Sequence, residues 1–173
     1  RSRTRRRGRT AGYYESVSAV ANSSKRAVLW LCLLAAVPWV VQFNTLTDLT
    51  AVMSWGLLNT DPWHVLPLPA YLGETQGLTT LPRSLQVWPL GLAFYAGAVV
   101  SAASGVVFGR EDVRVTAGLL ALTAVDSVIV WMGLLGRGTR GAIPVGVFAI
   151  AAVIWWFYLP QLGRSDGAET VRE

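Results

Sequence analysis

The sequence predicts an all-α integral membrane protein, a four-helix bundle with a partly ordered extracellular loop between spans one and two. The 173 residues are 53% hydrophobic and only 14% charged, whereas about a quarter of the residues in a soluble domain are charged. The charges are clustered, and the runs between the clusters reach the ~20 residues that a membrane-spanning helix needs. A soluble protein with buried helices is the alternative, but its apolar runs usually stop well short of this length.

The two central spans give the clearest signal. Residues 85–109 contain no charged residue, and residues 115–136 contain only Asp126. A short charged turn, residues 110–114, joins them. At about 1.5 Å per residue, each run is long enough as a helix to cross a hydrocarbon layer of about 30 Å. The complete prediction is a transmembrane domain over 27–163, with spans at 27–47, 85–109, 115–136 and 141–163 and an outer cap over 48–84.

The first predicted span follows a strongly basic segment. Residues 1–26 hold eight of the fifteen Lys and Arg residues without apolar periodicity, so we expect a disordered cytoplasmic N-terminus. Such a cluster can bind nucleic acid, but its place directly before an apolar run favours a topology signal, and we expect no nucleic-acid partner. The run 27–47 is too long for a typical secretory signal core, and Pro38 would kink the span.

The last predicted span and the distribution of basic residues set the orientation. Residues 141–163 open near Pro144 and close with aromatic residues 155–158, which are typical of a membrane interface, and a charged tail follows over 164–173. With the N-terminus inside, twelve Lys and Arg residues lie inside and only Arg83, Arg137 and Arg140 lie outside. The positive-inside rule therefore predicts a multi-pass protein of the cell membrane with both termini cytoplasmic.

The outer cap has a different composition from the spans. It mixes charges, prolines and aromatic residues, and the spacing of its apolar residues suggests a short interfacial helix over 49–58. Long connections with their own membrane anchors are more often functional than idle. The candidate residues of the cap are Trp55, Asp61, Trp63 and His64.

Asp126 is the strongest single candidate for function. A carboxylate at mid-membrane is costly, so such residues face the interior of a bundle and find partners. One interpretation is a proton or cation relay. The other is a protonated side chain that hydrogen-bonds to Thr123, Ser101 or Tyr95, because polar groups also hold membrane helices together. An Asp126→Asn variant separates the two, since only a relay would lose activity.

Small side chains recur every four residues along the second span. In lipid there is little hydrophobic drive to join helices, so small residues that allow close backbone approach supply the contact. The sequence predicts a packing stripe whose partner is either this chain or another copy. The stripe consists of Ala93, Gly97, Ser101, Gly105 and Gly109.

Other chemistry has little support in the sequence. His64 with Asp61 resembles half of a catalytic pair, but a nucleophile within hydrogen-bond reach is also needed. There is one cysteine, Cys32, and one histidine, whereas a structural zinc site takes several such ligands. We expect no catalytic residue, no metal and no cofactor.

Several stretches of the chain form a recognisable set: residues 55–59 and 61–64, Trp88-Pro89-Leu90, residues 108–112 with 114–116, and residues 142–146 with 155–158. They are similar to a family of small multi-pass membrane proteins of halophilic archaea. The resemblance covers about 28 to 162 and leaves out both charged ends. Members are often encoded near archaeosortase A, a membrane transpeptidase-like enzyme that processes surface proteins, so the resemblance implies an accessory role in surface-protein sorting. The archaeosortases depend on a Cys, Arg and His set that this chain does not resemble.

Together these features predict a non-enzymatic accessory or scaffold subunit of the cell membrane, linked to surface-protein sorting. Its expected partners are the lipid bilayer and either another membrane protein or further copies of itself. The alternative function is a small oligomeric transporter or ion-conducting protein that uses Asp126. Four spans are few for a transporter, and the internal repeats common in that class are not evident. An enzyme that uses His64 and Asp61 ranks last.

Overall fold

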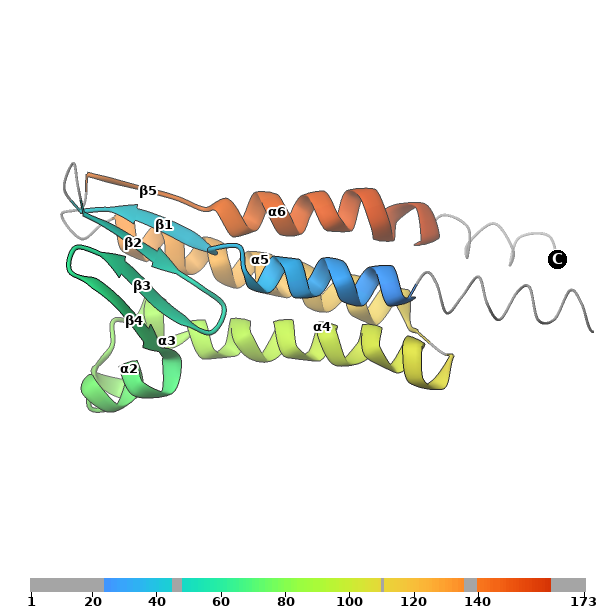
Figure 1. Cartoon of the computed structure of the whole chain (residues 1–173), viewed down its shortest axis with the longest axis horizontal. Coiled ribbons are helices and arrows are strands. Elements are labelled where there is room, and N and C mark those ends of the chain that lie inside the picture. Colours follow the sequence, from blue (N-terminus) through green and yellow to red (C-terminus); the bar gives the residue numbers. More distant parts are fainter. Residues whose placement is uncertain (1–23, 45–47, 110, 136–139, 163–173) are drawn as a thin grey trace, which may run out of the picture.

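The computed structural model describes residues 24–44, 48–109, 111–135 and 140–162. Four helical segments lie side by side along the long axis of the molecule, and a β-sheet with short helices lies at one end of them (Figure 1). The prediction of an all-α four-helix bundle is therefore wrong, because the chain combines helices with a five-stranded antiparallel sheet. The predicted disorder of the N-terminus up to residue 23, and the predicted tail 164–173, lie outside the described residues.

The sheet has the strand order β4-β3-β2-β1-β5, and every neighbouring pair is antiparallel. Strands β1 to β4 follow one another along the chain. Strand β5 comes after the two long helices α4 and α5 in sequence and pairs with β1. The strands are β1 Val40–Phe43, β2 Leu49–Val52, β3 Gly56–Thr60, β4 Trp63–Pro67 and β5 Gly141–Ile143.

The predicted first span, 27–47, is not one continuous helix. A helix occupies residues 24–35, and the chain then turns and continues as strand β1. Pro38 explains where the helix ends, because proline disfavours the helical conformation of the residue before it and cannot donate a backbone hydrogen bond. The β-branched residues Val40 and Val41 then favour the strand.

The predicted cap is an ordered sheet rather than a partly ordered loop, and the predicted helix over 49–58 is wrong. That stretch forms β2, a tight turn and β3, in which the Met53 N–H donates to the Gly56 carbonyl oxygen (2.8 Å). Gly56 suits this place because an added Cβ would lie 2.5 Å from the Leu66 oxygen of β4. The chain then continues through α2 Leu68–Glu74, a 3-10 turn Leu78–Thr80 and α3 Arg83–Gln86.

Three helices are long and apolar enough to cross a membrane, which confirms this part of the prediction for the last three spans. They cover Arg83–Phe108, Val113–Leu135 and Val145–Leu162. The first contains α3 and α4 Trp88–Phe108, the second is α5 Val113–Leu135, and the third contains α6 Val145–Val153 and the π-helical segment η2 Ile154–Tyr158. The last predicted span, 141–163, therefore begins as strand β5 and becomes helical only after Pro144.

Local sequence explains both the end of α4 and the start of α5. Gly109 ends α4 in the left-handed conformation (φ 67°), which glycine adopts without steric cost. The Asp112 carboxylate then accepts hydrogen bonds from the backbone N–H groups of Arg114 (3.0 Å) and Val115 (3.2 Å). This is the arrangement of an N-cap, and it fixes the start of α5.

Tryptophan side chains fasten the sheet to the helices. The Trp88 indole N–H on α4 donates to the Met53 oxygen at the β2–β3 turn (3.0 Å), and Trp88 is fully buried. The Trp131 indole on α5 donates to the Ala142 oxygen of β5 (2.8 Å). The Trp55 indole donates to the Ala35 oxygen at the end of the first helix (3.2 Å). Each bond links the sheet to a different helix, so the sheet is held rigidly at the end of the bundle.

Candidate functional site

Asp126 lies inside the helical bundle, against α4. Its side chain is only 4% exposed, and a Cβ placed on Gly91 would lie 2.0 Å from the Asp126 Oδ2 atom and 2.9 Å from the Trp39 ring. Only a glycine at position 91 leaves room for the carboxyl group. Within the described part of the chain, Oδ2 has no hydrogen-bond partner. A buried polar atom without a partner costs free energy, so this position is either functional or compensated by its surroundings.

The first turn of α4 is the part of the neighbouring helix that lies against Asp126. Gly91 is the fourth residue of α4, so the carboxyl group of Asp126 lies beside the N-terminal end of this helix. The backbone N–H groups of Leu90 and Gly91 both donate to the Val87 oxygen (2.8 and 3.1 Å), and Pro89 has no N–H, so these groups are not free to bind the carboxyl group.

The partners predicted for Asp126 are all bound elsewhere. The Thr123 hydroxyl donates to the Leu119 oxygen (2.9 Å), and Ser101 bonds to the Thr116 hydroxyl (2.7 Å). The Tyr95 hydroxyl donates to the Leu31 oxygen and so joins α4 to the first helix. Ser101 and Tyr95 thus join α4 to other helices, whereas the Thr123 bond stays within α5. The structure thus does not bring them together with Asp126 in one hydrogen-bonded cluster.

Sequence reasoning did not find Gly91 and Trp39, the residues that surround the carboxyl group. Gly91 belongs to the buried face of α4. Its helical spacing from the other residues of that face could have identified it from the sequence. The buried residues are Trp88, Gly91, Tyr95, Ala98, Ala102 and Gly105, spaced alternately by three and four. Trp39 carried no such signal, because it follows the end of the first helix and reaches Gly91 only in the folded chain.

The predicted small-residue stripe contacts other parts of this chain in three of its five positions. A Cβ on Gly97 would lie 3.3 Å from Leu119 of α5, and Ser101 bonds to α5 through Thr116. Gly105 is buried against Ser24 of the first helix. Ala93 and Gly109 are exposed.

Three of the four candidate cap residues lie at the β4 edge of the sheet. Asp61 is in the β3–β4 turn, and Trp63 (70% exposed) and His64 lie on edge strand β4. Trp55 is exposed, although its indole N–H is bonded to the first helix. His64 pairs in register with Asn59 of β3. Asp61, Trp63 and His64 therefore lie at one exposed edge, whereas Trp55 lies in the β2–β3 turn at the other end of β3, and no hydrogen bond among the described residues joins Asp61 to His64.

A row of polar residues crosses the sheet beside His64. Gln42, Thr50, Asn59 and His64 are successive register partners on β1, β2, β3 and β4, and directly opposed residues share a face of a sheet. The Thr50 hydroxyl donates to the Asn59 amide oxygen (3.3 Å) within this row. The residues come from four strands, so only the strand register brings them together.

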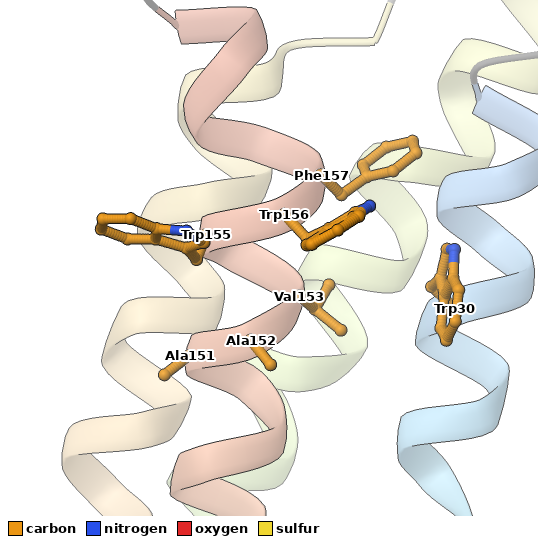
Figure 2. A pocket seen from close by; sticks show the side chains of 7 residues that line it. All are labelled: Trp30, Ala151, Ala152, Val153, Trp155, Trp156 and Phe157. Atoms are coloured by element: carbon orange, nitrogen blue, oxygen red, sulfur yellow. The ribbon is translucent and has the colours of Figure 1, made fainter.

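An apolar groove lies between the first helix and the last. It has a volume of about 730 Å³, and its lining includes Trp30 on one side and Val153, Trp156 and Phe157 on the other. Figure 2 shows Trp156 and Phe157 on the side of their helix that faces Trp30, whereas Trp155 lies on the opposite flank. The groove is at the π-helical segment η2, far from the sheet (Figure 1).

A buried polar cluster closes the bundle at the end opposite the sheet. Glu111, in the α4–α5 turn, accepts a hydrogen bond from the fully buried Tyr158 of η2 (3.4 Å) and one from Ser24 of the first helix. Burial raises the pKa of Glu111 above its ordinary value, and these hydrogen bonds only partly oppose the rise. The cluster joins three elements that are far apart in the sequence.

The described residues contain no group of three or more His, Cys, Asp or Glu side chains that could hold a metal ion. No curated protein and no solved structure matches this chain. Residues 10–167 match the model of a family described as a domain of unknown function, DUF8050. Because this match covers most of the 173 residues, the chain belongs to the DUF8050 family.

Proposed function

We propose that this protein is a multi-pass protein of the cell membrane whose sheet lies outside the cell and whose termini are cytoplasmic. The observation that carries the proposal is the reversed polarity of α5. This helix buries Thr116, Thr123, Asp126 and Ser127 and exposes apolar residues that include Leu122, Val125, Ile129 and Met132. In a water-soluble protein, polar side chains are mostly exposed and apolar ones mostly buried. In a membrane, apolar side chains face the lipid and polar ones lie within the bundle.

The orientation rests on charge and on the position of the sheet. Three of the fifteen Lys and Arg residues, Arg83, Arg137 and Arg140, flank the ends of the helices near the sheet in sequence. In sequence, the remaining twelve precede or begin the first helix, lie at the α4–α5 turn, or follow the last helix, and basic residues accumulate on the cytoplasmic side of membrane proteins.

Within this frame we propose a non-enzymatic accessory or scaffold role, in which the sheet binds another membrane protein. The three indole hydrogen bonds hold the sheet in a fixed position above the spans, which lowers the entropy cost of binding. Strand β4 is an edge strand whose residues Trp63, His64 and Val65 are exposed. Edge strands offer unpaired backbone groups to a partner, and tryptophan is enriched at interfaces. The resemblance to proteins encoded near archaeosortase A suggests a membrane enzyme of surface-protein sorting as that partner.

Site-specific photocrosslinking in native membranes tests the scaffold role. A photoreactive amino acid at Trp63 or Val65 should recover one membrane enzyme at close to one copy per chain. The same group at Met132, which is 62% exposed on α5, serves as the control and should crosslink mainly to lipid. Recovery of nothing but copies of this chain from the two β4 positions would reject the accessory role.

A second candidate, proton or cation transport, rests on the unpartnered Oδ2 atom of buried Asp126. Intramembrane carboxyl groups often mark ion pathways. Ion flux into liposomes that contain the purified chain tests this candidate. Asp126→Asn should abolish flux while the protein stays folded, and equal flux in both proteins would exclude Asp126 from transport.

A further inference from the structure

We propose that the apolar groove between the first helix and η2 binds one anionic phospholipid from the cytoplasmic leaflet. One hydrocarbon chain would lie along Trp30, Val153, Trp156 and Phe157, and the phosphate would lie at Lys25 and Arg26. The inference rests on the membrane location proposed above, but it adds a ligand site that neither the scaffold role nor transport requires.

The lining of the groove fits a hydrocarbon chain. The side chains that face each other across it are aromatic or aliphatic, and Trp30 (48% exposed) and Trp156 (84% exposed) leave it open on the outside of the bundle. The small side chain of Ala152 lets a chain approach the helix backbone. In lipid, such contacts gain through van der Waals packing rather than through the hydrophobic effect, so a preformed groove is what would retain one chain.

The shape is less suitable for a transmembrane helix of another protein. A helix with its side chains is about 10–12 Å across, and membrane helices pack closely over small residues. Here large rings of Trp30, Trp156 and Phe157 stand at the walls and would keep a second helix at a distance. A flexible hydrocarbon chain can pass between these rings.

Basic residues at the start of the first helix, beyond the apolar lining of the groove, specify the headgroup. Lys25 and Arg26 are exposed in the first turn of the described first helix. Arg26 precedes Trp30 by four residues, so the two side chains lie on one face of the helix, about 6 Å apart along its axis. Clusters of basic residues at the cytoplasmic end of membrane helices recognise anionic headgroups. The one acidic group of the buried cluster at this end, Glu111, is engaged by Tyr158 and Ser24 rather than presented at the groove.

The π-helical segment η2 shapes one wall. It follows α6 without a break and places Tyr158 in the core while Trp155 and Trp156 stay exposed. Single π-helical turns within α-helices occur frequently at functional sites, because the wider turn re-aims side chains. In this chain the turn coincides with the groove rather than with Asp126 or the sheet.

Native mass spectrometry of the full chain in detergent tests the proposal, with dioleoylphosphatidylglycerol and dioleoylphosphatidylcholine as probes. The wild-type protein should retain one phosphatidylglycerol molecule more tightly than phosphatidylcholine. Lys25→Gln combined with Arg26→Gln should weaken phosphatidylglycerol binding about 30-fold, since each cation near a membrane surface contributes about 1 kcal/mol. Arg114→Gln removes a cation from the same end of the bundle and should have a much smaller effect.

A second pair of variants tests the groove itself. Ala152→Trp fills it and should reduce binding of both lipids by at least about tenfold. Ala121→Trp places the same side chain at an exposed alanine of α5 and should leave binding unchanged. Trp30→Ala, which removes one wall without adding bulk, should also weaken binding if Ala152→Trp fails to fold.

Three results would overturn the proposal. They are equal affinity of the wild-type protein for the two lipids, equal binding by Ala152→Trp and Ala121→Trp, and a loss of dimers rather than of lipid in Ala152→Trp. The last result would assign the groove to a second copy of the chain. Recovery of the protein from cells in the soluble fraction without detergent would instead reject the membrane location itself, so the two failures are distinguishable.

Discussion

Replacing Gly91 by alanine should destabilise the fold through a specific clash with Asp126. The added Cβ would lie 2.0 Å from Oδ2 and 2.6 Å from Cγ of Asp126, and 2.9 Å from the Trp39 ring. Trp39 is 1% exposed, and its own backbone lies against Gly146, so it has little room to move. Overpacking of this kind costs about 1–3 kcal/mol.

Two controls turn this expectation into a measurement of the Asp126 contact. Alanine is favoured over glycine by about 1 kcal/mol in a helix, so the net cost of Gly91→Ala should be about 0–2 kcal/mol. Gly118→Ala on α5 is the matched control, because an added Cβ meets nothing within 4 Å there, and it should be neutral or stabilising by up to about 1 kcal/mol. In an Asp126→Ala background, the cost of Gly91→Ala should fall by at least about 1 kcal/mol.

Equilibrium unfolding of the purified protein in mixed micelles, followed by tryptophan fluorescence, gives these free energies. The description of the buried site is wrong if Gly91→Ala is as stable as Gly118→Ala. An unchanged cost of Gly91→Ala in the Asp126→Ala background would equally contradict it, because the clash would then involve other atoms.

Three further predictions concern other parts of the molecule. Because burial raises the pKa of Glu111 in the folded state, its protonated form stabilises the fold at low pH, and this stabilisation is lost as pH rises through the raised pKa. Between about pH 4 and pH 8 the melting temperature of wild type should therefore fall relative to that of Glu111→Gln, and parallel curves would contradict this. Trp88→Phe should cost about 2–4 kcal/mol because it leaves the buried Met53 oxygen without its indole donor, whereas exposed Trp55→Phe should cost less than about 1 kcal/mol in the same unfolding assay. A spin label on Cys32, the single and exposed cysteine, should be relaxed by oxygen more than by a polar nickel reagent in vesicles, and the reverse order would place this face in water.

The structure differs from the predicted four-helix bundle mainly in one region, the five-stranded sheet. Short strands of three to five residues replace the expected loop and the ends of two expected spans. In β2 and β3, the apolar residues Leu49, Val52 and Leu57 fit a helical spacing and a pair of strands equally well. The pairing of β2 with β3 is itself local, but the sheet to which both strands belong is completed by β1 and β5, whose paired residues are about 100 positions apart, and local sequence does not encode that contact.

The sequence by itself determined the long helices, the turn between α4 and α5 and the burial of Asp126. These features depend on local properties: long charge-free runs, the left-handed Gly109, the capping Asp112 and a single carboxylate in an otherwise uncharged helix. Only the tertiary structure decided what surrounds Asp126, how the sheet is fastened to the helices and where the groove lies. Each of these is a contact between distant segments, such as Gly91 with Asp126 or Trp88 with Met53, and no local propensity encodes which distant residue fills a given space.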